Sequence, residues 1–184
     1  LTENEPGIIE TFTGKRFGLI SPRPEDVCIE DIAHALARIC RFTGHCSRFY
    51  SVAAHSVWCA DYAKWRERPQ SECFAVLMHD ATEAYIGDIN SPLKILLGAR
   101  IKEIESRVAK AIAERFNLSP CDGKQEDLVA LATEARSIMY SGGKWWNLPY
   151  APSTRPLIAN TTIMGQEAAF MSAFRRLSPQ IVRA

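Results

Sequence analysis

The chain has 184 residues, of which 47% are hydrophobic and 23% charged, the balance of an ordinary globular protein with one buried core. Its 22 basic and 21 acidic residues leave a net charge of +1, which argues against a large surface for a nucleic-acid polymer. No apolar run approaches the roughly 20 residues of a membrane helix, and no signal segment is evident. We therefore expect a cytoplasmic protein that binds neither membrane nor nucleic acid.

The cysteines give no sign of a metal ribbon or a disulfide framework. None of them forms a CxxC pair, and a chain of this size does not need disulfides to hold its core together. We expect reduced thiols, in keeping with a cytoplasmic location. The six positions are Cys28, Cys40, Cys46, Cys59, Cys73 and Cys121.

The first 24 residues are predicted to form a short β-hairpin. Residues 8–13 are rich in β-branched and apolar side chains, Gly14 lies in a turn signal, and residues 16–20 form the returning strand. Pro22 and Pro24 end this segment.

Helical spacing of apolar residues then predicts a series of helices, so the fold class is all-α with a short N-terminal hairpin. Asp26 is a candidate N-cap of the first helix, which runs to about Phe42, and Ser51 can cap the second, which runs to about Arg66. The third begins at Ser71 and is apolar on every side, as in a helix buried inside a domain. Further helices are expected over residues 93–97, 99–117, from 122 or 127 to 140, and over 165–177.

The most informative polar feature is a His-Asp pair inside the third predicted helix. His79 and Asp80 interrupt an apolar run, where an unpaired carboxylate is costly. Glu83 follows within one helical turn, Asp88 comes soon after, and His55 lies upstream in the second helix. Imidazole and carboxylate groups are good ligands for a divalent metal ion. The alternative for the pair alone is a hydrogen-bonded core histidine beside a locally paired aspartate.

The order of these residues resembles the signature of the HD superfamily of metal-dependent phosphohydrolases. His55, then His79-Asp80, then a later Asp follow the H…HD…D pattern, and the strings around them look like the bacterial 5′-deoxynucleotidases and related dATP triphosphohydrolases. The resemblance covers about residues 29–139.

The resemblance implies a single HD domain over the whole chain. Residues 25–140 would form the HD-domain helical bundle, residues 1–24 an N-terminal extension, and residues 141–184 an irregular segment followed by a C-terminal helix.

The resemblance also implies a site for one divalent ion, which would be Mn, Co, Zn, Mg, Ni or Fe. Its ligands would be His55, His79, Asp80 and an Asp on a later helix. Asp127 matches the family's segment for this fourth ligand, and Glu134 is the rival position.

Roles in catalysis and substrate binding follow from the same resemblance. Glu83 would be the general acid/base, and Asp88 would hold the attacking water or the sugar. Arg41-Phe42 resembles the Arg-Trp pair that contacts substrate in the nucleotidases; Phe42 keeps a stacking face but lacks the indole donor. Lys94 would offset charge on the phosphoryl oxygens, with a solvated surface lysine as the alternative.

Two histidines and two tryptophans lie outside the signature. His34 is expected to be structural or to line the pocket, and His45 to be a loop residue near Arg41. Trp145 and Trp146 are expected to cover the end of the helical bundle, with stacking on a base as the alternative.

Taken together, these features predict a hydrolase that converts a deoxynucleoside monophosphate to a deoxynucleoside and phosphate. Triphosphohydrolase activity on a deoxynucleoside triphosphate is the first alternative, and the small number of further cations disfavours it. A non-catalytic HD module that senses a nucleotide is the alternative of another class. By analogy with the family, we expect a homodimer or a higher homo-oligomer.

Overall fold

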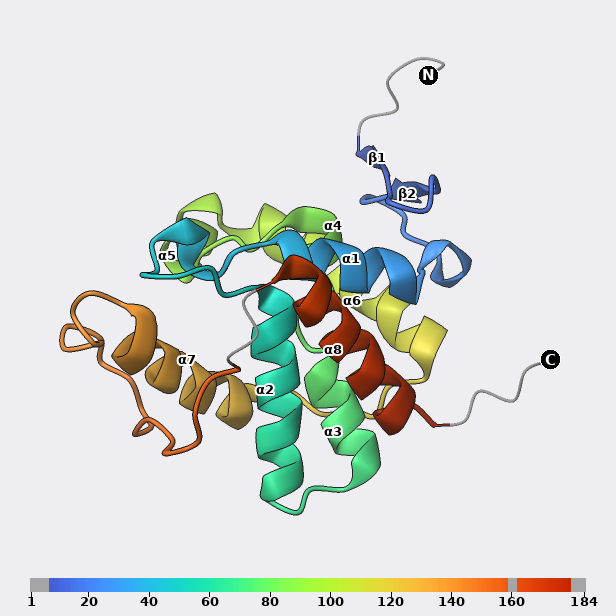
Figure 1. Cartoon of the computed structure of the whole chain (residues 1–184). Coiled ribbons are helices and arrows are strands. Elements are labelled where there is room, and N and C mark those ends of the chain that lie inside the picture. Colours follow the sequence, from blue (N-terminus) through green and yellow to red (C-terminus); the bar gives the residue numbers. More distant parts are fainter. Residues whose placement is uncertain (1–6, 159–161, 180–184) are drawn as a thin grey trace.

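The computed structural model describes residues 7–158 and 162–179, and these residues are mainly helical (Figure 1). They form eight α-helices, two short 3-10 helices and one two-stranded antiparallel sheet. The expected all-α class with a short N-terminal hairpin is therefore confirmed. The helical elements are η1 (Pro24–Asp26), α1 (Ile29–Arg38), η2 (Arg41–Gly44), α2 (Val52–Trp65), α3 (Gln70–Leu77), α4 (Glu83–Ile86), α5 (Ser91–Leu97), α6 (Ala99–Phe116), α7 (Lys124–Ile138) and α8 (Ile163–Leu177).

The hairpin is shorter than predicted and is tied to the helices at two points. Strands β1 (Ile8–Glu10) and β2 (Arg16–Gly18) pair antiparallel. Phe17 is fully buried and stacks on Tyr85 at 3.9 Å between ring centroids. The carboxylate of Asp31 in α1 accepts hydrogen bonds from the backbone N–H (2.7 Å) and the hydroxyl (3.0 Å) of Thr13.

Helix α2 lies at the centre of the bundle because nearly all of it is apolar or small. Every residue from Val52 to Ala60 is buried. The helix packs against α1, α3, α7 and α8 (Figure 1). Its N-cap is Ser51, as predicted, whose hydroxyl accepts a hydrogen bond from Ala54 N at 3.1 Å. His55 is thereby held inside the core.

Helix α1 is shorter at both ends than apolar spacing predicts. Its N-cap is Cys28, whereas Asp26 closes the preceding turn η1. The helix ends at Arg38 because the chain turns to form an isolated antiparallel bridge between Cys40 and Ser51. Apolar residues continue past the helix end because this connection is itself partly buried.

The prediction of one helix running through the His-Asp pair is wrong. Helix α3 ends at Leu77, and α4 begins only at Glu83. Between them Ala81 N bonds Met78 O (3.0 Å), and Glu83 N bonds Asp80 O (3.0 Å), so the chain follows tight three-residue turns. The apolar run indicates that this segment is buried, but it does not show that the segment is helical.

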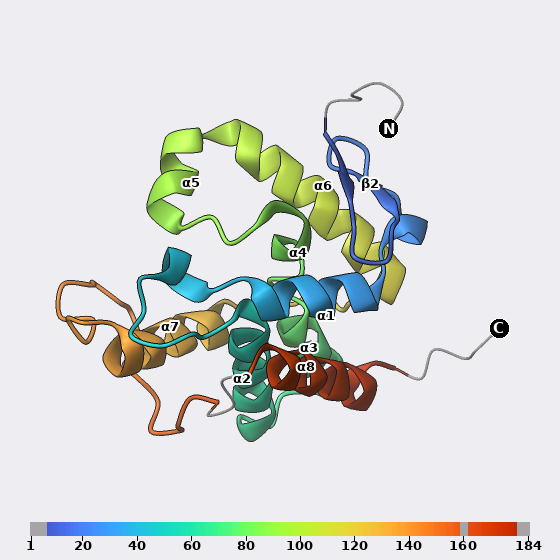
Figure 2. The ribbon, with the colours of Figure 1, turned by 45° about the horizontal axis from the view of Figure 1, so that its top comes forward.

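The remaining helices lie close to their predicted ranges: α6 begins at Ala99 as predicted, and the others begin at different residues. Pro69, Asn90, Gly123 and Thr162 take the N-cap positions of α3, α5, α7 and α8. Figure 2 shows η2 between α5 and α7, and α8 lying along α1. Within the described residues, no helix combines the length and apolar composition that crossing a membrane requires.

Candidate metal centre

Four side-chain atoms from three separate parts of the chain converge on one point. Nε2 of His55 lies 3.3 Å from Nε2 of His79, 3.4 Å from Oδ2 of Asp80 and 3.3 Å from Oδ1 of Asp127. Nε2 of His79 lies 3.2 Å from the same Asp80 oxygen. The structure thus brings together all four residues predicted as metal ligands.

These separations suit a single bound ion. Ligand atoms held about 2.1 Å from one cation lie about 3.0–3.4 Å apart at octahedral or tetrahedral angles. The four measured distances fall between 3.2 and 3.4 Å. The turn after α3 makes this possible, because on a regular helix two adjacent side chains point about 100° apart.

The hydrogen-bond partners of the two imidazoles also favour a cation. Nδ1 of His79 lies 2.7 Å from the carbonyl oxygen of Val76, which can only accept, so that nitrogen carries the hydrogen. Nδ1 of His55 likewise donates to Oε1 of Glu134 at 2.6 Å. In the neutral form, which is the form that binds a metal, each ring turns an Nε2 lone pair toward the other ring and toward Asp80. Acceptors facing one another without a hydrogen between them fit a metal ion.

The charges around this point are mutually dependent. Burial raises the pKa of Asp80, but His79, His55 and Arg41 lower it more, so the pKa lies well below its usual range. Burial also raises the pKa of Asp127, yet the adjacent His55 makes the net direction downward. Burial lowers the pKa of His79, and Asp80 raises it above its ordinary value. The carboxylates are therefore ionised and require positive charge beside them.

Cys59, one helical turn after His55, is a donor that sequence reasoning missed. Its Sγ lies 3.6 Å from His55 Nε2, and with His55 and His79 it forms another group able to hold an ion. Burial raises the pKa of Cys59 to about 11, so the thiol is neutral at physiological pH, whereas the thiolate is the good ligand. We therefore assign the site to the imidazoles and carboxylates; helical spacing from His55 was the available signal for Cys59.

Glu134, the rival fourth ligand, lies on the opposite side of the His55 ring. It is fully buried, and its bond to Nδ1 directs it away from Nε2, where the other ligand atoms gather. Burial raises the pKa of Glu134, but Arg41 and His55 lower it by more, so the net direction is downward and the carboxylate is ionised. The geometry favours Asp127 as the fourth ligand.

Arg41 and Phe42 lie at the edge of this group of ligands. Nη1 of Arg41 is 3.9 Å from Asp80 Oδ2, and its Cζ lies 5.3 Å from the centre of the Phe42 ring. Phe42 faces Trp146 with ring centroids 5.7 Å apart and planes tilted by 53°. Trp145 is 83% exposed. Trp146 therefore packs beside Phe42, whereas Trp145 points largely to solvent.

Glu83 is buried beside the ligands and holds a proton. It is 5% exposed, and its Oε2 has no hydrogen-bond partner within the described part of the chain. Burial, together with the charges of Asp80 and Asp88, raises the pKa of Glu83 to about 9. Burial also raises the pKa of Asp88, against the opposing effect of Arg41.

The other predicted positions lie outside the ligand group. Nζ of Lys94 is 2.7 Å from Oε1 of Glu105 on α6, so its ammonium already has an anionic partner. His34 stacks on Phe12 with ring centroids 3.5 Å apart. His45 is exposed at the end of η2.

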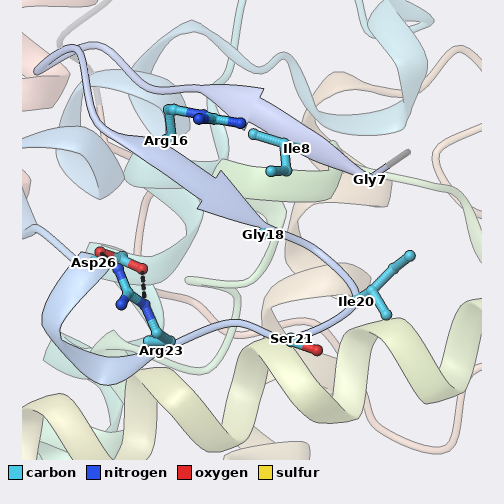
Figure 3. A pocket seen from close by; sticks show the side chains of 8 residues that line it. All are labelled: Gly7, Ile8, Arg16, Gly18, Ile20, Ser21, Arg23 and Asp26. Atoms are coloured by element: carbon cyan, nitrogen blue, oxygen red, sulfur yellow. Dashed lines mark hydrogen bonds and ion pairs between the residues drawn. The ribbon is translucent and has the colours of Figure 1, made fainter. Parts of the chain in front are cut away.

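Two hollows beside the hairpin are not part of this centre. One of about 560 Å³ is lined by residues of β1, β2 and the segment before α1, and its Arg23 is paired with Asp26 (Figure 3). The other, of about 420 Å³, lies between β1, α1 and α4. None of the four predicted ligands lines either hollow. The chemistry of the donor atoms, and not the size of a hollow, identifies the candidate site.

Comparison with known proteins gives relatives without an assigned activity. No family model matches the chain. It is 35% identical over 118 residues to the uncharacterized protein RCAP_rcc00048 of Rhodobacter capsulatus, covering 58% of this chain and 57% of that protein. It is 44% identical over 141 residues to the uncharacterized protein YfdR of Escherichia coli strain K12, covering 75% of this chain and 76% of that protein. The chain therefore belongs to the same family as YfdR.

Proposed function

We propose that the protein is a metal-dependent phosphohydrolase of the HD superfamily that acts on deoxynucleotides as a 5′-deoxynucleotidase. The observation that carries the proposal is the convergence of these side chains: His79, Asp80 and Asp127 each place a ligand atom 3.3–3.4 Å from Nε2 of His55, and His79 lies 3.2 Å from Asp80. The resemblance of their order in the chain to the HD signature supports the same assignment.

The four side chains would hold one divalent ion, and its charge would polarise a phosphoryl oxygen and make a nearby water more acidic. That water attacks phosphorus, and the bond from phosphorus to the 5′ oxygen breaks. Glu83 keeps its proton near neutral pH because its pKa is about 9, so it can protonate the leaving 5′ oxygen. The proton released by the attacking water then restores Glu83. Asp88 is close enough to influence Glu83 and would hold the water or the sugar.

Arg41 supplies positive charge for the phosphoryl group. Two of its nitrogens face Glu134, which leaves the Nη1 hydrogens beside Asp80 for an anionic oxygen. Phe42 presents an aromatic face next to it. Lys94 contributes less directly, since it is paired with Glu105.

This distribution of cations favours a monophosphate over a triphosphate. Among the described residues that pair with a predicted metal ligand, Arg41 is the one arginine or lysine. A triphosphate brings several more negative oxygens that need partners. A non-catalytic sensor has no need of a buried, protonated carboxyl group such as Glu83 beside the ion.

The remaining parts of the proposal concern the whole protein. A cytoplasmic location agrees with the cysteines, all six of which are free thiols. A single HD domain and a homodimer or higher homo-oligomer follow from the family resemblance, and the exposed Ile95 and Leu96 of α5 offer apolar surface for a second subunit.

The test is release of phosphate from a panel of deoxynucleoside mono- and triphosphates with Mn²⁺, Co²⁺ or Mg²⁺. We expect turnover of monophosphates, and a rate at least about 100-fold lower for Glu83→Ala, because that change removes the proton donor. Release of triphosphate from the triphosphates would support the first alternative. Metal binding without turnover of any compound would contradict an enzyme and favour the sensor.

A further inference from the structure

One buried carboxylate contacts both a predicted metal ligand and the cation predicted to bind substrate. Glu134 lies in α7 with no exposed surface. Its Oε1 accepts from His55 Nδ1 at 2.6 Å. Its Oε2 accepts from Nε and Nη2 of Arg41 at 3.3 and 3.2 Å. The two partners come from α2 and η2, so α7 joins two elements that are separate in the chain.

The first of these contacts determines which nitrogen of His55 is free. A hydrogen bond to a carboxylate keeps the hydrogen on Nδ1 and leaves the lone pair on Nε2, which faces His79, Asp80 and Asp127. The opposite tautomer would place a hydrogen among the ligand atoms and exclude the ion.

The second contact fixes the plane of the Arg41 guanidinium. Two of its nitrogens share one carboxylate oxygen, which leaves the hydrogens of Nη1 on the side of Asp80, 3.9 Å away. Arg41 is largely buried, so water offers it no equivalent alternative.

We propose that Glu134 is a positioning residue that couples metal binding at His55 to phosphoryl binding at Arg41. Binding of an ion strengthens the orientation of His55 and with it the placement of Glu134. The same carboxylate then holds Arg41 ready for the substrate anion. The inference rests on the proposed function for the identity of that anion, but its first arm needs no turnover.

The first arm is calorimetric titration of chelator-treated protein with Mn²⁺ alone. Glu134→Gln keeps the size of the side chain, but its NH2 group is a donor and replaces one of the two oxygens, so the side chain cannot accept at both the His55 and the Arg41 positions. We expect Mn²⁺ affinity to fall about 10–100-fold. The matched control is Glu126→Gln, also fully buried on α7, whose partner Arg68 (2.7 Å) lies outside the site.

The second arm measures binding of inorganic phosphate to the Mn²⁺-saturated protein. Glu134→Gln and Arg41→Lys should each weaken phosphate binding, and the double variant should lose less than the sum, because both changes disrupt one contact. Glu134→Asp keeps the charge and should recover part of the Mn²⁺ affinity. If Glu134→Gln fails to fold, Glu134→Asp is used in its place.

Two results would overturn the coupling, and two others would overturn the metal centre on which it rests. If Glu134→Gln binds Mn²⁺ as tightly as the unchanged protein does, Glu134 does not support metal binding, although the metal centre itself stands. An equal loss in Glu126→Gln would show that any buried charge on α7 has this effect. Absence of Mn²⁺ binding in the unchanged protein, or binding that survives His55→Ala, would contradict the metal centre itself.

Discussion

Glu83 combines burial with a raised pKa, and this gives the protein a specific dependence of stability on pH. Its pKa rises from an ordinary value of 4.5 to about 9 in the folded chain. Between these values the folded chain keeps a proton that the unfolded chain has released, so the free energy of unfolding falls as pH rises. The slope from one such group is at most about 1.4 kcal/mol per pH unit.

Glu83→Gln should remove this contribution, because glutamine does not titrate. Urea unfolding of chelator-treated protein at pH 6, 7 and 8 should therefore show a shallower decline of stability in the variant than in the unchanged protein. Identical slopes for the two proteins would mean that Glu83 is ionised in the fold.

At the scale of residues, the sequence was informative about which groups carry chemistry and less so about how they are paired. The order of His55, His79-Asp80 and Asp127 predicted residues that the fold does bring together. The partnership of Glu134 with Arg41 was not predictable, because the two are 93 residues apart and no local pattern connects them.

Among the elements, α7 depends on a buried ion pair at its first turn. Glu126 is fully buried, and Oε2 lies 2.7 Å from Nη1 of Arg68, which precedes α3. Arg68→Ala should lower the free energy of unfolding by about 2–4 kcal/mol, since it leaves a buried carboxylate with only the more distant Arg66 at 3.5 Å. Arg176→Ala breaks the more exposed pair with Asp61 and should cost less than about 1 kcal/mol. Equal losses by urea unfolding would refute the assignment.

The turn η2 holds two residues in a conformation that L side chains disfavour. Phe42 and Thr43 have φ of 57° and 54°. A β-branched side chain is especially unfavourable there, whereas asparagine tolerates it. Thr43→Asn should therefore raise the free energy of unfolding by about 1 kcal/mol. Thr43→Ala removes the branching, but alanine tolerates this conformation less well than asparagine, so the free energy of unfolding should rise by a smaller amount. A larger rise for alanine than for asparagine would contradict backbone strain at Thr43.

The ends of α1 and α3 show where sequence patterns stop being informative. Apolar spacing predicted a first helix reaching Phe42 and a third helix containing His79, but the helices end at Arg38 and Leu77. Periodicity reports which side chains are buried, and a buried turn has the same composition as a buried helix. The caps were recoverable only where a hydroxyl bonds the first turn, as at Ser51.

At the scale of the molecule, the candidate metal centre joins α2, the turn after α3 and α7. An ion that binds only the folded chain adds about 2.7 kcal/mol to the free energy of unfolding when its concentration is 100 times its Kd. For a chain of this size, Mn²⁺ should then raise the Tm by about 5–10 °C. His34→Ala should keep this shift and His79→Ala should lose it; the opposite pattern in a thermal melt would place the ion elsewhere.

The overall architecture was predictable in class but not in packing. Composition and periodicity predicted an all-α chain with a hairpin, and the structure confirms it. The position of α2 between α1, α3, α7 and α8 depends on contacts between distant segments. Those contacts are what turn separate polar residues into one site.

The most direct test is a titration of chelator-treated protein with Mn²⁺, at protein concentrations well above the Kd, while phosphate release from a deoxynucleoside monophosphate is followed. We predict a rate that rises to a plateau at one ion per chain, is retained in His34→Ala and is lost in His55→Ala and Asp127→Ala. Phosphate release that is independent of metal, or that survives in both ligand variants, would contradict it.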